Sequence, residues 1–220
     1  MISIAIDGPS GAGKSTLARR LAADLGYVYV DTGAMYRSIG LYAVRCGVDP
    51  HDAAAVEALL PRIKLEIRLL EGTQHIYLNG EDVSEAIRAE AIGMAASAVS
   101  AHPAVRAFLL DTQRGLACSQ NVLMDGRDIG TVVLPDATVK IYLTASAEAR
   151  ADRRCRELRQ KGQDAVYETV LADIRQRDDQ DMHRAIAPLK QAEGAIRIDT
   201  SEIDFDQSFA LLRRTILEHI

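Results

Sequence analysis

The sequence predicts an α/β fold in which helices cover both faces of a doubly wound parallel sheet. Three observations lead to this prediction. Short apolar, β-branched segments alternate with longer helical stretches. A glycine-rich turn joins the first predicted strand to the first predicted helix. The alternation is interrupted once and then resumes, which indicates a small inserted lobe.

The N-terminal part predicts two strands, each followed by a helix. Residues 2–6 are apolar and β-branched and end in an Asp-Gly turn, which predicts a buried strand. Leucines at four-residue spacing then predict a helix that stops before Gly26. Residues 27–30 predict the second strand, and apolar positions between residues 31 and 46 predict the second helix.

The next part of the chain has a different pattern. An Ala-rich helical stretch is followed by period-two alternation at residues 63–70 and by a partner strand at residues 76–78, which together predict a hairpin. We therefore expect a small lobe at about residues 59–98, inserted into the parallel core. Helical stretches at residues 89–100 and 105–117 return the chain to that core.

The C-terminal part completes the predicted sheet. Residues 121–124 and 139–143 predict buried strands, and residues 196–198 predict a short one. Residues 205–216 carry apolar side chains at helical spacing, which predicts an amphipathic closing helix.

Composition narrows the class of protein. The chain has 220 residues, a formal charge of −5 and 48% hydrophobic residues, which excludes a disordered chain and favours one folded domain. No apolar run reaches the roughly 18 to 20 residues that span a bilayer, and no basic leader precedes the first strand, so we expect a cytoplasmic protein. Net acidity argues against nucleic-acid or membrane-surface binding. The scattered cysteines and histidines argue against a zinc site or a disulfide framework.

The basic residues are unusual in kind, because 21 are arginines and only five are lysines. Genome composition is one explanation. The other is chemical, since the arginine side chain forms fork-shaped hydrogen bonds to phosphates and carboxylates.

Residues 8–15 fit the pattern G-x-x-x-x-G-K-S/T and lie between a predicted strand and a predicted helix. Such a P-loop binds phosphates through backbone N–H groups and the positive end of the following helix. Lys14 would supply an ammonium for the β and γ phosphates, and Ser15 a hydroxyl for Mg²⁺. A glycine-rich turn without a ligand is the plainer alternative. The sequence contains no Asn-Lys-x-Asp motif, which would read guanine, and none of the long additional segments of ATPases. We therefore expect a small kinase.

Three further clusters, residues 31–37, 125–130 and 177–184, each place arginine beside acceptor groups. In the last, Arg177, Asp181 and Arg184 share one face if the segment is helical. Taken alone, that face is more simply a solvated ladder of salt bridges. Together with a P-loop, the three clusters are better explained as walls of a site for an anionic substrate.

With these motifs in register, the sequence resembles the bacterial type of cytidylate kinase, a branch of the nucleoside monophosphate kinases. The resemblance runs nearly end to end, through GPSGAGKST at 8–16, DTGAMYR at 31–37, DGRDIGTVV at 125–133, and RDxxDxxR at 177–184. It implies a P-loop kinase fold with a core at residues 1–32 and 122–220, a monophosphate-binding region at 33–121 that contains the inserted lobe, and a lid at about 153–164. It also implies that a monomer transfers the γ-phosphoryl group of ATP to CMP or dCMP, with Mg²⁺ as cofactor.

The resemblance also implies which residues form the site. ATP would be bound by Gly8, Pro9, Ser10, Gly11, Ala12, Gly13, Lys14, Ser15 and Thr16. The phosphate of CMP would contact Ser10, Arg37, Arg127 and Arg184; the cytosine would contact Ser97, Arg106 and Asp128; the sugar would contact Arg177 and Asp181; Thr32 and Tyr36 would line the pocket. The candidate catalytic residues are Lys14, Arg127, Arg153 and Arg184, and the candidate metal ligand is Ser15.

These residue types suit the chemistry. Cytosine presents a donor at N4 beside acceptors at N3 and O2, so an acceptor from Asp128 or Ser97 and a donor from Arg106 would select it over uracil. The accepting phosphate is mostly dianionic at neutral pH, so no general base is required. Lid closure would exclude water, with Gly162 as a candidate hinge. Arg150 lies one turn before Arg153, and for it a solvent-facing basic stripe on the helix is the plainer interpretation.

Two other functions remain open from the sequence. A P-loop kinase for another small metabolite would need a general base near the acceptor and fewer phosphate-directed arginines. A nucleotide-binding regulatory module without turnover would not require Arg37, Arg127, Arg177 and Arg184 to converge on the P-loop.

Overall fold

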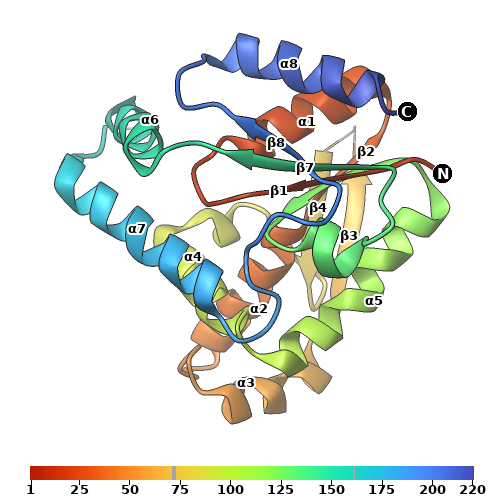
Figure 1. Cartoon of the computed structure of the whole chain (residues 1–220). Coiled ribbons are helices and arrows are strands. Elements are labelled where there is room, and N and C mark those ends of the chain that lie inside the picture. Colours follow the sequence, from red (N-terminus) through yellow and green to blue (C-terminus); the bar gives the residue numbers. More distant parts are fainter. Residues whose placement is uncertain (71–72, 161) are drawn as a thin grey trace.

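The structure is a computed structural model that describes residues 1–70, 73–160 and 162–220. A five-stranded parallel sheet forms its centre, in the order β2-β6-β1-β7-β8 (Figure 1). The strands are β1 (Ser3–Asp7), β2 (Val28–Asp31), β6 (Val122–Gly126), β7 (Val139–Thr144) and β8 (Ile196–Asp199). The predicted parallel sheet is therefore confirmed, with strand ends shifted by one or two residues.

Helices cover both faces of the sheet because alternate strand residues face opposite sides. Ile4 and Ile6 pack in one apolar cluster with residues of α1 (Lys14–Leu25) and α8 (Phe205–Leu217). Ala5 belongs to the other cluster, with residues of α2 (Thr32–Arg45) and α5 (Pro103–Ser119). In Figure 1, α1 and α8 accordingly lie on one side of the sheet and α2 and α5 on the other.

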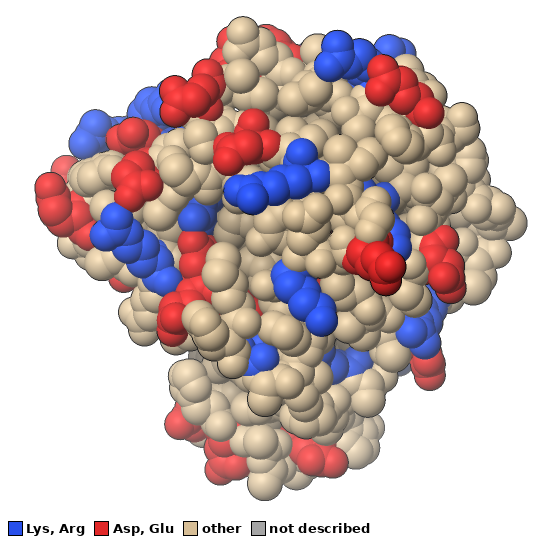
Figure 2. Space-filling model, in the orientation of Figure 1, with Lys and Arg blue, Asp and Glu red and all other residues tan. Residues whose placement is uncertain are grey.

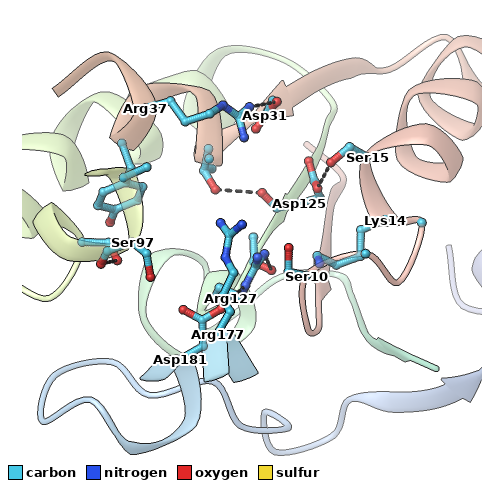
Figure 3. A pocket seen from close by; sticks show the side chains of 18 of the residues that line it. Ser10, Lys14, Ser15, Asp31, Arg37, Ser97, Asp125, Arg127, Arg177 and Asp181 are labelled. Atoms are coloured by element: carbon cyan, nitrogen blue, oxygen red, sulfur yellow. Dashed lines mark hydrogen bonds and ion pairs between the residues drawn. The ribbon is translucent and has the colours of Figure 1, made fainter. Parts of the chain in front are cut away.

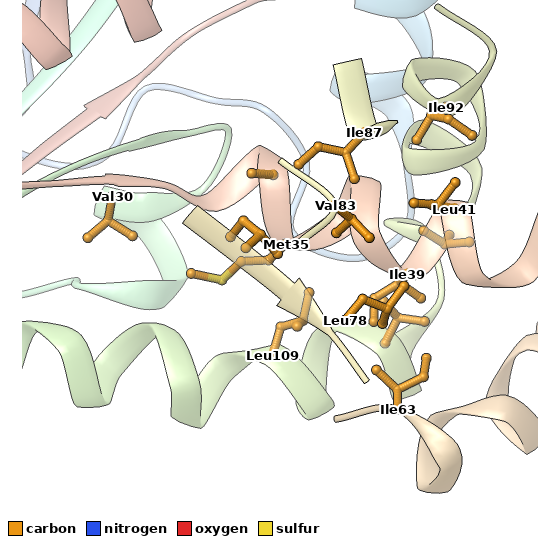
Figure 4. Packing of buried hydrophobic residues seen from close by; sticks show 14 of the residues in the cluster. Val30, Met35, Ile39, Leu41, Ile63, Leu78, Val83, Ile87, Ile92 and Leu109 are labelled. Atoms are coloured by element: carbon orange, nitrogen blue, oxygen red, sulfur yellow. The ribbon is translucent and has the colours of Figure 1, made fainter. Parts of the chain in front are cut away.

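The inserted region forms a second, antiparallel sheet of β3 (Leu65–Leu70), β4 (Thr73–Leu78) and β5 (Glu81–Asp82). The predicted hairpin is confirmed, and β5 is an addition to it. Two helices flank this sheet in the chain, α3 (Ala53–Leu59) and α4 (Glu90–Val99). Apolar side chains of the inserted region pack with α2 in one continuous cluster (Figure 4), so the lobe shares the core of the parallel sheet.

Close approach between α2 and α4 depends on a small residue. A Cβ atom added at Gly40 would lie 3.0 Å from the backbone nitrogen of Ala96, so a larger side chain would push the helices apart. This contact holds α4, and with it Ser97, against the helix that carries Tyr36 and Arg37.

Two long helices follow β7. They are α6 (Ala147–Gln160) and α7 (Tyr167–His183), which pack against each other beside the sheet (Figure 1). The predicted lid at 153–164 begins within α6 and ends in the connection to α7; its residue 161 lies outside the described residues. Gly162 has a φ of 72°, and its N–H donates to the carbonyl of Arg159, so this glycine closes the end of α6.

The surface agrees with an acidic chain of mixed charge. On the face seen in Figure 2, basic and acidic side chains are interspersed among the described residues, without a continuous basic stripe. Within the described part of the chain, every helix is too short or too polar to cross a membrane.

Candidate active site

Most of the predicted site residues meet at one cavity at the carboxyl ends of β1, β2 and β6. Its volume is about 440 Å³. The residues that line it include Ser10, Lys14, Ser15, Thr16, Thr32, Tyr36, Arg37, Ser97, Arg106, Arg127, Asp128, Arg153, Arg177, Asp181 and Arg184. Gly11 and Gly13 also line it, whereas Gly8, Pro9 and Ala12 form the loop without lining the cavity. The convergence of Arg37, Arg127, Arg177 and Arg184 is what a kinase requires and a passive binding module does not.

Backbone geometry explains the glycines of the P-loop. Gly8 has a φ of 153°, and a Cβ atom there would lie 1.9 Å from the carbonyl oxygen of Leu143. Gly13 has a φ of 83° and immediately precedes α1, so it turns the chain into the helix in a left-handed conformation. The loop thereby places the N-terminus of α1 at the cavity, where backbone N–H groups favour an anion.

Lys14 is buried at the floor of the loop, with 5% of its surface exposed (Figure 3). Its Nζ donates to the carbonyl oxygen of Pro9 at 2.7 Å. Burial, with the nearby positive charge of Arg127, lowers the pKa of this ammonium well below its usual value. An anionic ligand would therefore find here a cation whose charge is poorly compensated by the protein.

Asp125 is a site residue that the sequence reasoning left without a role. Its carboxylate accepts hydrogen bonds from Ser15 Oγ and from the Tyr29 hydroxyl, both at 2.8 Å (Figure 3). Thr32 donates to the backbone carbonyl of Asp125 at 2.7 Å. Burial, followed by repulsion from Asp31, raises the pKa of Asp125. The signal that points to it is its position at the end of a central strand beside the P-loop.

This pair of oxygens fits a magnesium site. Among the described residues, His, Cys, Asp and Glu form no cluster of three or more that would enclose a metal ion by itself. Mg²⁺ bound with a nucleotide usually takes one or two protein oxygens and completes its shell with phosphates and water. The hydroxyl of Ser15 and the buried carboxylate of Asp125 are therefore the donors suited to it.

The start of α2 places Arg37 at the cavity. Asp31 caps the helix, with Oδ1 accepting from the N–H of Ala34 at 2.9 Å. Its second oxygen accepts from Arg37 Nη2 at 2.7 Å. The same carboxylate thus starts the helix and orients an arginine that lies six residues further on.

A network of buried charged side chains lines another part of the cavity. Its residues lie far from the P-loop in the sequence. Arg106 of α5 forms an ion pair with Asp128, and both side chains are less than 10% exposed. Arg184 approaches the other oxygen of Asp128 at 3.5 Å and donates to the carbonyl of Ala187 at 2.7 Å. The ring of Tyr36 lies 5.5 Å from the Arg106 guanidinium, so it covers one side of this pair.

Arg127, Arg177 and Asp181 lie together near Ser10 of the P-loop (Figure 3). Arg127 Nε donates to Asp181 Oδ2 at 2.8 Å. Burial raises the pKa of Asp181, but Arg127, Arg177 and Arg184 together outweigh it, so the net pKa is lowered and the carboxylate stays charged. Arg177 lines the same cavity, and its buried Nε has no hydrogen-bond partner within the described part of the chain. Burial together with Arg127 lowers its pKa to about 10. Arg177 is thus the arginine of this group that is least neutralised by the protein.

The structure corrects two of the plainer interpretations. Asp181 is 5% exposed and the Arg184 side chain 8% exposed, so Arg177, Asp181 and Arg184 do not form a solvated ladder. Arg150 is 4% exposed and does not belong to a solvent-facing stripe. Its Nη1 donates to the carbonyl of Ser10 and to Asp178, both at 2.9 Å, so it ties the P-loop to α7.

Arg153 lines the cavity, but its present partners lie outside it. Its guanidinium donates to the backbone carbonyl of Thr200 and, more weakly, to that of Ile203. A catalytic role for Arg153 would require its Nη2 group to leave these carbonyls, which now accept its hydrogen bonds.

Comparison with known proteins gives a consistent family. A family model for cytidylate kinase matches residues 4–216. The cytidylate kinase of Caldicellulosiruptor bescii is 49% identical over 206 residues, covering 94% of this chain and 91% of that protein. The cytidylate kinase of Nocardia farcinica is 48% identical over 218 residues, covering 99% and 94%. A solved structure of an uncharacterized protein from Eubacterium ventriosum shares the fold, with a TM-score of 0.54, 12% identity and 98% coverage of both chains.

Proposed function

The chain belongs to the cytidylate kinase family, and from this premise we propose that it transfers the γ-phosphoryl group of ATP to CMP or dCMP. One observation carries the proposal: a single cavity joins a P-loop to a group of buried and partly buried arginines. The P-loop side suits the triphosphate of ATP. The arginine side suits a second, smaller anion that carries a base.

The mechanism needs positioning and charge neutralisation more than proton transfer. An oxygen of the CMP phosphate, mostly dianionic at neutral pH, attacks the γ-phosphorus, and the bond to the ADP oxygen breaks. Lys14 and the N–H groups of the loop would hold the donor phosphates. Arg37, Arg127 and Arg184 would hold the acceptor phosphate in line and neutralise the charge that spreads over the transferred group.

Selection of cytosine would come from the buried network. An acceptor from Asp128 or Ser97 would face the amino group at N4, and Arg106 would donate to N3 or O2. The pair between Arg106 and Asp128 fixes both groups before the base arrives. Uracil would place a carbonyl against an acceptor, and mispaired buried polar groups cost about 1 to 3 kcal/mol each. Arg177 and Asp181 would contact the sugar.

Magnesium fits the Ser15 and Asp125 oxygens together with the phosphates of ATP. When bound, it would neutralise charge on the β and γ phosphates. Ser15 and Asp125 would supply the protein oxygens that bind the ion. The hydrogen bond from Tyr29 would hold the carboxylate of Asp125 in place beside Ser15. We further propose that the enzyme acts as a monomer in the cytoplasm and that the end of α6 closes over ATP as a lid.

The proposal is tested by following ADP release with Mg-ATP and each nucleoside monophosphate in turn. We expect rapid turnover with CMP and dCMP and at least tenfold lower turnover with UMP, because uracil mispairs with the base site. Equal turnover with AMP, GMP or UMP, or no turnover with CMP, would refute the proposal. ATP hydrolysis without an acceptor should be slow and serves as the blank.

A further inference from the structure

At one edge of the parallel sheet, a side chain of the inserted lobe forms the hydrogen bonds that a neighbouring strand would form. β2 lies at one edge of that sheet, and Asp31 is its last residue. Gln74 of β4 accepts a hydrogen bond from the Asp31 N–H at 2.8 Å and donates to the Asp31 carbonyl at 3.3 Å. A carboxamide has the same donor and acceptor as a peptide group, so Gln74 satisfies both backbone groups of this edge residue.

The residue held in this way also controls an arginine of the active site. The two oxygens of Asp31 accept from the N–H of Ala34 and from Arg37. Space around this contact is tight, because a Cβ atom added at Gly33 would lie 3.1 Å from Asp31 Oδ1 and 3.3 Å from Arg37 Nη1. A change in the backbone of Asp31 would therefore move its carboxylate and the guanidinium bound to it.

The contact with Asp31 orients the guanidinium of Arg37. Among the residues that the structure describes, none forms a hydrogen bond with the buried Nε of Arg37. Arg37 and Asp31 line the active-site cavity on one side and a small cavity of about 40 Å³ on the other, where Gln74 is also found. Gln74 thus stands directly behind the pair, on the side away from the substrate.

We infer that Gln74 is a positioning residue for the acceptor phosphate, which it would orient through the backbone of Asp31 and the guanidinium of Arg37. The inference rests on the proposed function, because it assigns Arg37 to the phosphate of CMP. It also gives the inserted lobe a part in the reaction: the lobe sets the geometry of the monophosphate site without supplying Gln74 to the substrate.

The test compares KM for CMP with KM for ATP in Gln74→Leu, which keeps the size of the side chain and removes both hydrogen bonds. We expect KM for CMP to rise about tenfold, since an orienting contact is lost and two backbone groups are left unpaired. KM for ATP should stay within about twofold, because the P-loop is unchanged. Gln74→Glu keeps the acceptor for the Asp31 N–H but places a carboxylate oxygen against the Asp31 carbonyl, so KM for CMP should rise here too, and this variant serves if the leucine variant folds poorly.

Ser84→Ala is a matched control in the same lobe. Ser84 Oγ accepts from the N–H of Ile76 at 3.0 Å, so this change also removes a side-chain hydrogen bond to a β4 backbone group, but one that does not reach Asp31. It should leave KM for CMP within about twofold of the wild-type value. A rise equal to that of Gln74→Leu would overturn the inference, because it would mean that any weakening of the lobe has the same effect.

A double-mutant cycle with Arg37→Ala tests the route. If Gln74 acts through Arg37, adding Gln74→Leu to Arg37→Ala should raise KM for CMP no further. Additive losses would overturn the inference, as would an unchanged KM in Gln74→Leu or equal rises for CMP and ATP. Turnover of CMP by the wild-type enzyme tests the proposed function separately, so an active wild type with a normal Gln74→Leu variant would refute only the role of Gln74.

Discussion

The two halves of the cavity are built in different ways. The P-loop half comes from one continuous stretch, residues 8–16, and places a single buried lysine at the end of a helix. The acceptor half comes from α2, α4, α5, α7 and the end of β6, and its charged groups are arginines paired with buried aspartates. The first half would bind its ligand largely through backbone groups. The second half would bind its ligand through side chains whose positions depend on ion pairs with one another.

This difference suits the two substrates. Phosphates of a triphosphate are alike in every nucleotide, so a backbone cradle is sufficient to bind them. A nucleoside monophosphate must be recognised by its base as well, and this needs donors and acceptors fixed in place. Each aspartate in the acceptor half costs desolvation, which its arginine offsets, so removal of either partner leaves a buried charge.

The largest effect is expected in the P-loop half. Lys14→Met should lower kcat by about 10³-fold, because it removes the buried P-loop cation that is proposed to neutralise charge on the transferred group. CMP affinity should change little, since the acceptor half keeps its own pairs. Steady-state kinetics with CMP and calorimetric titration of CMP measure the two quantities.

Lys140→Met is a matched control. Lys140 also donates to the carbonyl of a proline five residues earlier, Pro135, but at an exposed position. Its kcat should stay within about twofold of the wild-type value. If Lys14→Met lost CMP affinity as strongly as turnover, the two halves would not be separable in the way described above.

Arg184→Lys is expected to have the next largest effect, about 10²-fold on turnover, because a point ammonium cannot replace a planar fork between two phosphates. Arg184 is buried and lies between Asp128 and Asp181, so its replacement also unbalances the acceptor half. Arg213→Lys provides the control, since Arg213 forms a partly exposed ion pair with Asp24 on the surface. Near-normal turnover of Arg184→Lys would mean that this arginine serves only the internal network.

The sequence predicted the P-loop half more completely than the acceptor half. Residues 8–16 contact one another locally, so their pattern carries the whole arrangement. The buried face of α6 could not be predicted from a local pattern. Arg150 and Arg153 are one turn apart, and only the packing of α7 shows that Arg150 is buried against Asp178. In the same way, the site of Asp125 depends on Tyr29, which is 96 residues away in the chain.

The acceptor half was predicted through motifs, and its internal pairing was not. Arg106 and Asp128 were both expected at the cytosine, but the ion pair between them requires α5 to meet the loop after β6. Gln74 lies in the inserted hairpin, between the period-two stretch at residues 63–70 and the strand predicted at residues 76–78, and this pattern does not show which sheet edge the residue faces. Long-range contacts of this kind follow from the assembled fold.

Asp7 lies where the two halves meet and gives a prediction for stability against pH. Its carboxylate accepts from the N–H groups of Ile129 and Gly130, both at 2.7 Å. Burial outweighs these two donors and raises its pKa from 3.8 to about 6. Between these values the unfolded chain releases the proton while the folded protein keeps it, so stability contributed by Asp7 is present below pH 4 and is lost as the pH rises to 6.

Urea unfolding of the wild type and Asp7→Asn between pH 4 and pH 7 tests this. The free energy of unfolding of the wild type, relative to that of the variant, should fall by up to about 3 kcal/mol over this range. Asn cannot ionise, so its own curve lacks this component. If the difference in free energy of unfolding between the two proteins were constant over this range, Asp7 would titrate normally and its carboxylate would be accessible to water.

The smallest and most specific effect is expected for Asp128→Asn, which probes base recognition within the acceptor half. Asn keeps one acceptor for Arg106 but removes the charge that is proposed to face N4 of cytosine, so the preference for CMP over UMP should fall about tenfold. KM for ATP should stay nearly constant, because Asp128 belongs to the half away from the P-loop. Asp206→Asn, at an exposed pair with Arg20, is the control for loss of one negative charge. Equal losses of affinity for CMP and ATP would mean that Asp128 supports the whole cavity, whereas an unchanged preference would assign cytosine selection to Ser97 and Arg106.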